Sequence, residues 1–129
     1  MKPLQDYSFL KGVNHGFERD EAALRRHLGY GKRLGINSVR IWLSYKEFAN
    51  EGTGYVDALR QYIRVCDSEG VTVMPILFNG NGIDPAILEE AFLPEGETFA
   101  KAIVEGVKDE PGLIMWDIMN EPPCNPLIL

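Results

Sequence analysis

Short apolar runs alternate along the chain with stretches in which apolar residues recur at helical spacing. Four of these runs are predicted to be β-strands, at about residues 11–15, 36–43, 71–78 and 113–120. The last run is mostly aliphatic and contains no glycine or proline, which predicts a strand buried on both faces. Strands and helices that alternate with short connections predict an α/β fold with parallel strands and right-handed crossovers.

Three main helices are predicted between the strands. The first begins at Asp20, a good N-cap residue, the second covers about residues 55–69 and ends at Gly70, and the third begins at Thr98. A shorter helical piece is predicted at residues 85–92. The buried stripes of the main helices are predicted at Leu24, Leu28 and Leu34, at Val56, Leu59, Ile63 and Cys66, and at Phe99, Ile103 and Val107.

Two of the predicted strands carry residues that are unusual in a sheet. The second strand places Ser38, Arg40 and Trp42 on one face, and a Trp on that face is expected to line a barrel interior rather than meet water. From there Arg40 can reach carboxylates at the barrel mouth, although an Arg paired with Asp or Glu for packing reasons is an equal alternative. In the third strand, Pro75 removes a ladder donor, which predicts a bulge or a position facing an irregular gap.

The fourth predicted strand stops abruptly on Asn120, Glu121 and Pro122. Proline has no N–H and cannot extend a central strand, so the strand delivers an amide and a carboxylate to a fixed place. A lone Glu after a strand more often marks the point where the chain reaches water, or caps the next segment. The surrounding residues therefore decide how Glu121 is interpreted.

Residues 116–122, Trp-Asp-Ile-Met-Asn-Glu-Pro, resemble the end of the fourth barrel strand in clan A of the glycoside hydrolases. This is the superfamily of β-mannanases, family 5 cellulases and β-galactosidases. The resemblance implies that Glu121 is the general acid/base and that Asn120 holds the sugar 2-hydroxyl. The string around Arg40 resembles the clan's Asn-x-Val-Arg-Ile, whose Arg supports the catalytic carboxylates. A β-linked oligo- or polysaccharide is the substrate that the resemblance implies.

The chain of 129 residues is predicted to be one domain, half of a (β/α)8 barrel, which needs about 250 residues and eight strands. The clan's nucleophile Glu lies on strand seven, which has no counterpart in this sequence. We therefore expect either a retaining β-glycosidase lineage or a non-catalytic half-barrel that binds carbohydrate weakly or acts in assembly. The inner face and the two edges of a half-barrel would be exposed, and we expect one of three arrangements to cover them. Two copies close the barrel as a homodimer, the sheet flattens in flavodoxin-like fashion, or the missing half belongs to a longer gene product.

Three further residues near the ends of predicted strands are candidate substrate-binding residues: His15, Trp42 and Asn79. Aromatic faces suit the C–H surfaces of pyranose rings, and polar groups fix their orientation. Backbone bonding of His15, core packing of Trp42 and a turn amide at Asn79 are the alternatives. Asp117 is expected to be buried or hydrogen-bonded in the barrel core.

Charge and composition exclude some classes of binding partner. The net charge is −6 and the 13 basic residues are dispersed, which argues against nucleic acid and anionic membrane surfaces. No apolar run approaches the ~20 residues of a membrane span, and no secretory signal is recognisable, so a cytoplasmic location is the default. Cys66 and Cys124 are expected to be free thiols. Scattered acidic residues and the lack of a Gly-rich phosphate loop predict no metal or organic cofactor.

Overall fold

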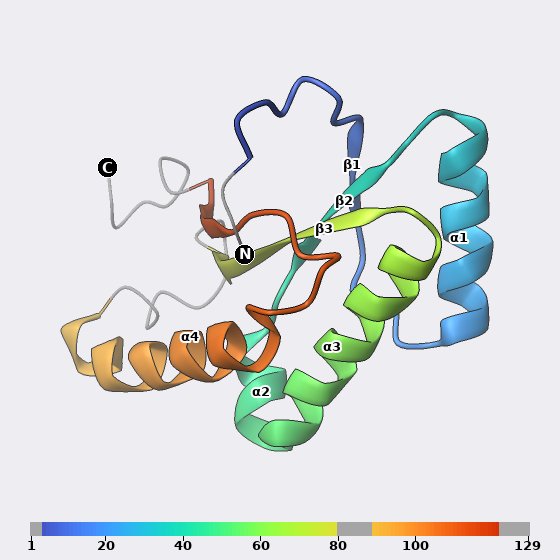
Figure 1. Cartoon of the computed structure of the whole chain (residues 1–129). Coiled ribbons are helices and arrows are strands. Elements are labelled where there is room, and N and C mark those ends of the chain that lie inside the picture. The colour runs from blue at the N-terminus through green and yellow to red at the C-terminus, as the bar shows by residue number, and fades with distance from the viewer. Residues whose placement is uncertain (1–3, 80–88, 122–129) are drawn as a thin grey trace.

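The computed structural model describes residues 4–79 and 89–121. Four parallel strands form one sheet in the order β1-β2-β3-β4, with the helices along one side of it (Figure 1). The strands are β1 (Gly12–His15), β2 (Ser38–Trp42), β3 (Thr72–Asn79) and β4 (Asp117–Asn120). The predicted α/β fold with four parallel strands is confirmed. A flavodoxin-like sheet would begin in the order 2-1-3, so the sequential order observed is that of a barrel.

The helices fill the connections between the strands. They are α1 (Glu21–Arg33), α2 (Tyr45–Glu51), α3 (Thr53–Ser68), the short 3₁₀ helix η2 (Glu90–Phe92) and α4 (Leu93–Val107). Of the helical piece predicted at residues 85–92, the last three residues form η2, and the first four lie outside the described part of the chain.

Helix α1 begins where the sequence predicts, because the Asp20 carboxylate accepts a hydrogen bond from the Ala23 backbone N–H at 2.7 Å. Leu24 and Leu28 are buried as expected, but the prediction of Leu34 in the stripe is wrong. The helix ends at Arg33, and Leu34 becomes the C-cap with 81% of its surface exposed.

The region around α2 and α4 departs further from the prediction. The sequence predicts no helix at α2, where the Ser44 hydroxyl accepts from the Glu47 N–H at 3.2 Å and starts a two-turn helix. Helix α4 begins at Leu93, with Pro94 in its first turn, instead of at Thr98. Thr98 lies inside the helix and donates its hydroxyl hydrogen to the Pro94 carbonyl at 2.9 Å.

The hydrophobic core lies between the sheet and the helices. The predicted stripes of α3 and α4 are confirmed, since all seven of their residues are buried. They pack against Val39, Ile41 and Val73 from the central strands. Each fully buried aliphatic side chain of this kind contributes about 1.5–3 kcal/mol.

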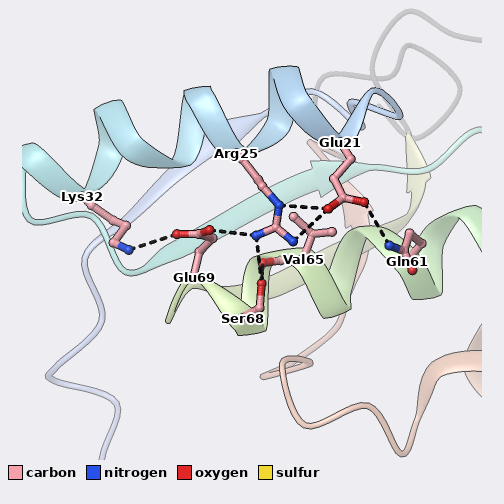
Figure 2. A network of polar contacts seen from close by, with 7 residues as sticks. All are labelled: Glu21, Arg25, Lys32, Gln61, Val65, Ser68 and Glu69. Carbon is pink, nitrogen blue, oxygen red and sulfur yellow. Dashed lines mark hydrogen bonds and ion pairs between the residues drawn. The ribbon is translucent and has the colours of Figure 1, made fainter.

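A polar surface network joins α1 to α3 on the solvent side (Figure 2). The Arg25 guanidinium lies 2.8 Å from carboxylate oxygens of both Glu21 and Glu69, and the Lys32 ammonium lies 3.1 Å from Glu69. Exposed pairs of this type contribute about 0–1 kcal/mol each. Their structural consequence is that α1 is held along α3, with its N-terminal half next to the end of β1.

The edge between β3 and β4 contains a bulge. From the bridge of Val73 with Leu113 to the pair of Ile76 with Asp117, β3 advances by three residues and the partner segment by four. Val73 exchanges hydrogen bonds with the β4 side, at Gly112 O and Ile114 N, so the alternate residue Pro75 presents its missing N–H toward the bulge. The interpretation of this proline as a bulge or gap position is confirmed.

The predicted strand at 113–120 is shorter in the structure, and one inference about it is wrong. The bulge leaves residues 114–116 outside the strand, so β4 begins at Asp117. Ile118 is 64% exposed, whereas burial on both faces was predicted. β4 is an edge strand of the described sheet, and no further strand within residues 4–79 and 89–121 pairs with its outer side.

None of the helices in the described residues has the length and the apolar composition that a membrane span requires.

Candidate functional site

Four polar residues from β2, β3 and β4 come together toward the carboxyl edge of the sheet. We call this group the Arg40 cluster: Arg40, Asn79, Asp117 and Asn120. The carboxyl ends of parallel strands meet at one edge of a sheet, and barrel enzymes build their sites there. Three of the predicted site residues, Arg40, Asn79 and Asn120, belong to this cluster.

Arg40 is paired mainly with Asp117. Its Nε and Nη2 donate to the same carboxylate oxygen at 2.9 and 2.5 Å, and both side chains are 24% exposed. Its Nη1 lies 3.4 Å from Asn14 Oδ1 on β1. The carboxylate that balances the Arg40 charge is thus one that the sequence assigned to the barrel core. Asp117 is hydrogen-bonded, as expected, but it lies at the site.

Asn120 is held at both ends of its amide. It is 7% exposed, its Oδ1 accepts from Arg40 Nη2 at 3.0 Å, and its Nδ2 donates to Asn79 Oδ1 at 3.2 Å. A charged donor on the oxygen side fixes which way the amide faces. The side chain is therefore pre-oriented before any ligand arrives.

Glu121 follows Asn120 directly and has an unusual backbone. Its φ is +47°, which makes it the one non-glycine residue with positive φ among the described residues. A left-handed conformation costs a residue with a Cβ atom about 1–2 kcal/mol, and such strain concentrates at functional sites. Glu121 is exposed.

Trp42 lies beside the Arg40 cluster. The guanidinium carbon of Arg40 is 5.6 Å from the centre of the Trp42 ring system, so the half-buried indole flanks the cation. Trp42, Tyr45 and Asn79 line a hollow of about 240 Å³ at the ends of β2 and β3. Tyr45 was missed by the sequence reasoning because α2 was not predicted, although the Ser44 cap signal precedes it.

His15 lies in a different group. Its Nδ1 is 2.8 Å from the Tyr62 hydroxyl on α3, and its Nε2 is 3.2 Å from His27 Nδ1 on α1. Burial lowers the pKa of His15, and the neighbouring His27 lowers it further. These contacts are made with side chains, and the backbone of Gly16 also acts on His15 and raises its pKa, so backbone bonding stays an alternative. Its role in substrate binding stays a prediction.

Cys66 is a buried free thiol, as predicted, and Cys124 lies outside the described residues. Burial raises the pKa of the Cys66 thiol to about 12, so it is protonated at neutral pH. Among residues 4–79 and 89–121, no group of three or more His, Cys, Asp and Glu side chains is arranged to hold a metal ion.

Solved structures share this fold. The endo-1,4-β-mannanase of Rhizomucor miehei matches with a TM-score of 0.67 and 17% identity, over 88% of this chain and 44% of that one. The endoglucanase Cel5A of Pseudomonas stutzeri matches with a TM-score of 0.71 and 20% identity, over 94% and 44%. A family 5 glycoside hydrolase from Bacteroides vulgatus matches with a TM-score of 0.58 and 21% identity, over 83% and 26%.

The chain spans less than half the length of each of these enzymes. At identities near 20% these similarities establish the fold alone, and they confirm the prediction that the chain folds as part of a (β/α)8 barrel. No protein-family model and no curated protein matches the sequence.

Proposed function

We propose that this chain forms the first half of the catalytic barrel of a retaining β-glycoside hydrolase that acts on a β-linked glycan. The observation that carries the proposal is the hydrogen bond of 3.0 Å from Arg40 Nη2 to Asn120 Oδ1, which joins β2 to the residue preceding Glu121. The solved structures that share the fold are glycoside hydrolases, among them a mannanase and an endoglucanase, which supports the same class of reaction.

Glu121 is proposed as the general acid/base. A retaining glycosidase uses two carboxyl groups about 5–5.5 Å apart, one of which attacks the sugar while the other protonates the departing oxygen. The acid residue, now ionised, then removes a proton from the water that releases the sugar. We assign no nucleophile within this chain, so the second carboxyl group is expected from the remaining half of the barrel.

Asn120 and Arg40 are proposed to prepare the sugar site. The amide of Asn120 carries two N–H donors, and one of them contacts Asn79, so the other is assigned to the sugar 2-hydroxyl. Arg40 acts by fixing the Asn120 carbonyl oxygen. Since Asp117 balances the charge of Arg40, the main contribution of Arg40 is the hydrogen bond that positions Asn120, and its positive charge contributes less.

The hollow next to the cluster is proposed as a sugar subsite. Its volume of about 240 Å³ suits one pyranose ring, with the Trp42 indole against the ring face and the Asn79 amide toward a hydroxyl. Ser44, at the N-terminus of α2, lines the same hollow.

Binding tests the sugar site without requiring the second carboxylate. Cellotriose and β-1,4-mannotriose are titrated into the ¹⁵N-labelled chain, and the side-chain signals of Asn120 and Trp42 are followed. We expect both to shift, and Asn120→Ala to abolish the shift at Trp42. Asn50→Ala, an exposed Asn on α2, is the control and keeps it. Unchanged binding by Asn120→Ala would show that the sugar site lies elsewhere.

Catalysis is tested in a protein that contains both halves of the barrel. Glu121→Ala is expected to lose most activity on aryl β-glycosides with poor leaving groups and less on those with good ones, since acid catalysis matters most for poor leaving groups. Full activity of this variant on both substrates contradicts the assignment of Glu121.

A non-catalytic half-barrel, closed by a second copy, is the other candidate. Ile118 on β4 is 64% exposed and borders an apolar hollow of about 630 Å³, which also includes Phe78 and Leu93, and Val13 on β1 is 46% exposed. Open edges of this kind favour association, and a two-fold axis would pair β4 with β1 of the second copy.

Light scattering of the purified chain tests this candidate. Ile118→Lys is expected to convert a dimer to monomer, whereas Leu34→Lys, which alters the exposed C-cap leucine of α1, is expected to leave the mass unchanged. A wild-type monomer argues against closure by a second copy. Hydrolysis by the isolated chain that is abolished by Glu121→Gln rules out a non-catalytic role.

A further inference from the structure

The chain contains two histidines, and the fold brings them together. His15 ends β1 and His27 lies on α1, with His15 Nε2 and His27 Nδ1 3.2 Å apart. Two nitrogens bound to one tetrahedral zinc ion at 2.0–2.1 Å are separated by about 3.4 Å. In the metal-free chain the two nitrogens share a hydrogen bond, and their separation is close to that of two ligands of one metal ion, which would replace the shared hydrogen.

The contact of His15 with Tyr62 orients the ring for metal binding. The Tyr62 hydroxyl lies 2.8 Å from His15 Nδ1, within hydrogen-bond distance. Metal binding through Nε2 requires that the Tyr62 hydroxyl oxygen accept from Nδ1–H, because the lone pair of His15 then lies on Nε2. Metal-binding histidines commonly donate their other ring N–H in this manner, which fixes tautomer and ring orientation.

The space in front of the pair is open to an ion. A hollow of about 230 Å³ is lined by both histidines together with Gly16, Phe17 and Glu18. The Glu18 carboxylate is near enough to act electrostatically on His15, and it favours a cation there. Since the described residues contain no group of three or more potential ligands, water molecules would complete the coordination of a bound ion.

We propose that His15 Nε2 and His27 Nδ1 bind a divalent transition-metal ion, such as Zn²⁺, Ni²⁺ or Cu²⁺, which links β1 to α1. Imidazole nitrogen selects these ions over Mg²⁺ and Ca²⁺, which prefer oxygen ligands. The ion stabilises the native chain because the unfolded chain does not hold the two rings together. The site shares no residue with the Arg40 cluster, so it does not depend on the proposed glycosidase function.

The test titrates the untagged chain with ZnCl₂ and with NiCl₂ at pH 7.5, by calorimetry and by NMR of the imidazoles. We expect one ion per chain, simultaneous shifts of both histidines, a higher Tm and loss of binding at pH 5.5, where protons compete for the nitrogens. His27→Gln, which alters an exposed residue, is expected to lower the affinity at least tenfold.

Two further variants separate a built site from a chance contact. Tyr62→Phe removes the acceptor for His15 Nδ1–H and is expected to weaken binding roughly tenfold, as other second-layer changes do. Arg26→Gln, at the position before His27, is the control and keeps the wild-type affinity. No saturable binding below about 1 mM metal, a shift of only one histidine, or wild-type affinity in His27→Gln would each overturn the proposal.

Discussion

Arg40 and Asp117 are 77 positions apart in the sequence and form the central ion pair of the site. Two N–H groups of one guanidinium donate to a single carboxylate oxygen, at 2.9 and 2.5 Å. The pair joins β2 to β4 across β3 and leaves the second Nη2 hydrogen for Asn120. Because both partners are only 24% exposed, the interaction is screened less by solvent than the ion pairs on the helix surfaces.

Asp117→Asn is expected to lower the free energy of unfolding by about 1–3 kcal/mol, since it leaves a half-buried guanidinium without its counter-charge. Urea denaturation measures this. Asp57→Asn is the matched control: Asp57 pairs with Arg60, but its side chain is 67% exposed, and we expect a loss of less than about 1 kcal/mol. Equal losses in the two variants would contradict a special role for the Arg40–Asp117 pair.

Glu121→Gly is expected to raise the free energy of unfolding by about 0.5–1 kcal/mol, because glycine adopts φ of +47° without the steric cost of a Cβ atom. Glu105→Gly, inside α4, is the control and is expected to lower stability by about 1 kcal/mol. The same urea experiment compares them. A loss in Glu121→Gly as large as that in Glu105→Gly would show that the left-handed turn stores no strain.

Periodicity was enough to predict the layers of this fold. The stripes of α3 and α4 and the four strands follow from local spacing, and parallel order follows from alternation. Helix α2 was missed because a two-turn helix has too few residues for a periodic signal. The exposure of Ile118 was also beyond local reasoning, since it depends on what lies next to β4.

The site was predictable in position but only partly in its contacts. Strand ends meet at one edge, so Arg40 was expected to reach a carboxylate at the barrel mouth. Which carboxylate Arg40 contacts depends on the register of β4, and this register is shifted by the bulge opposite Pro75. The contact of His15 with His27 depends on how α1 packs, which no local pattern in the sequence encodes.

Gly106→Ala is expected to destabilise the protein by about 1–3 kcal/mol, although alanine favours a helix. Gly106 lies where α4 crosses α3, and an added Cβ would overlap Val56 Cγ1. Gly29→Ala in α1 is the control, because nothing lies within 4 Å of its Cβ position, and we expect a gain of about 0.5–1 kcal/mol. Thermal unfolding measures both, and a gain in Gly106→Ala would mean that the helices separate easily.

The stability of the metal-free chain is expected to fall as the pH drops below about 6.5, the ordinary pKa of histidine. Burial and His27 lower the pKa of His15 in the folded state, so the folded protein favours the neutral ring. The resulting stabilisation is complete above the unfolded-state pKa and is lost as the pH falls through the lower folded-state pKa. Urea unfolding at pH 7.5 and 5.5, with EDTA present, measures the change in the free energy of unfolding between the two pH values.

In His15→Gln this change is expected to be smaller than in the wild type. In Lys46→Gln, an exposed substitution on α2, it is expected to equal that of the wild type. An equal pH dependence in His15→Gln and the wild type would place the titrating group elsewhere.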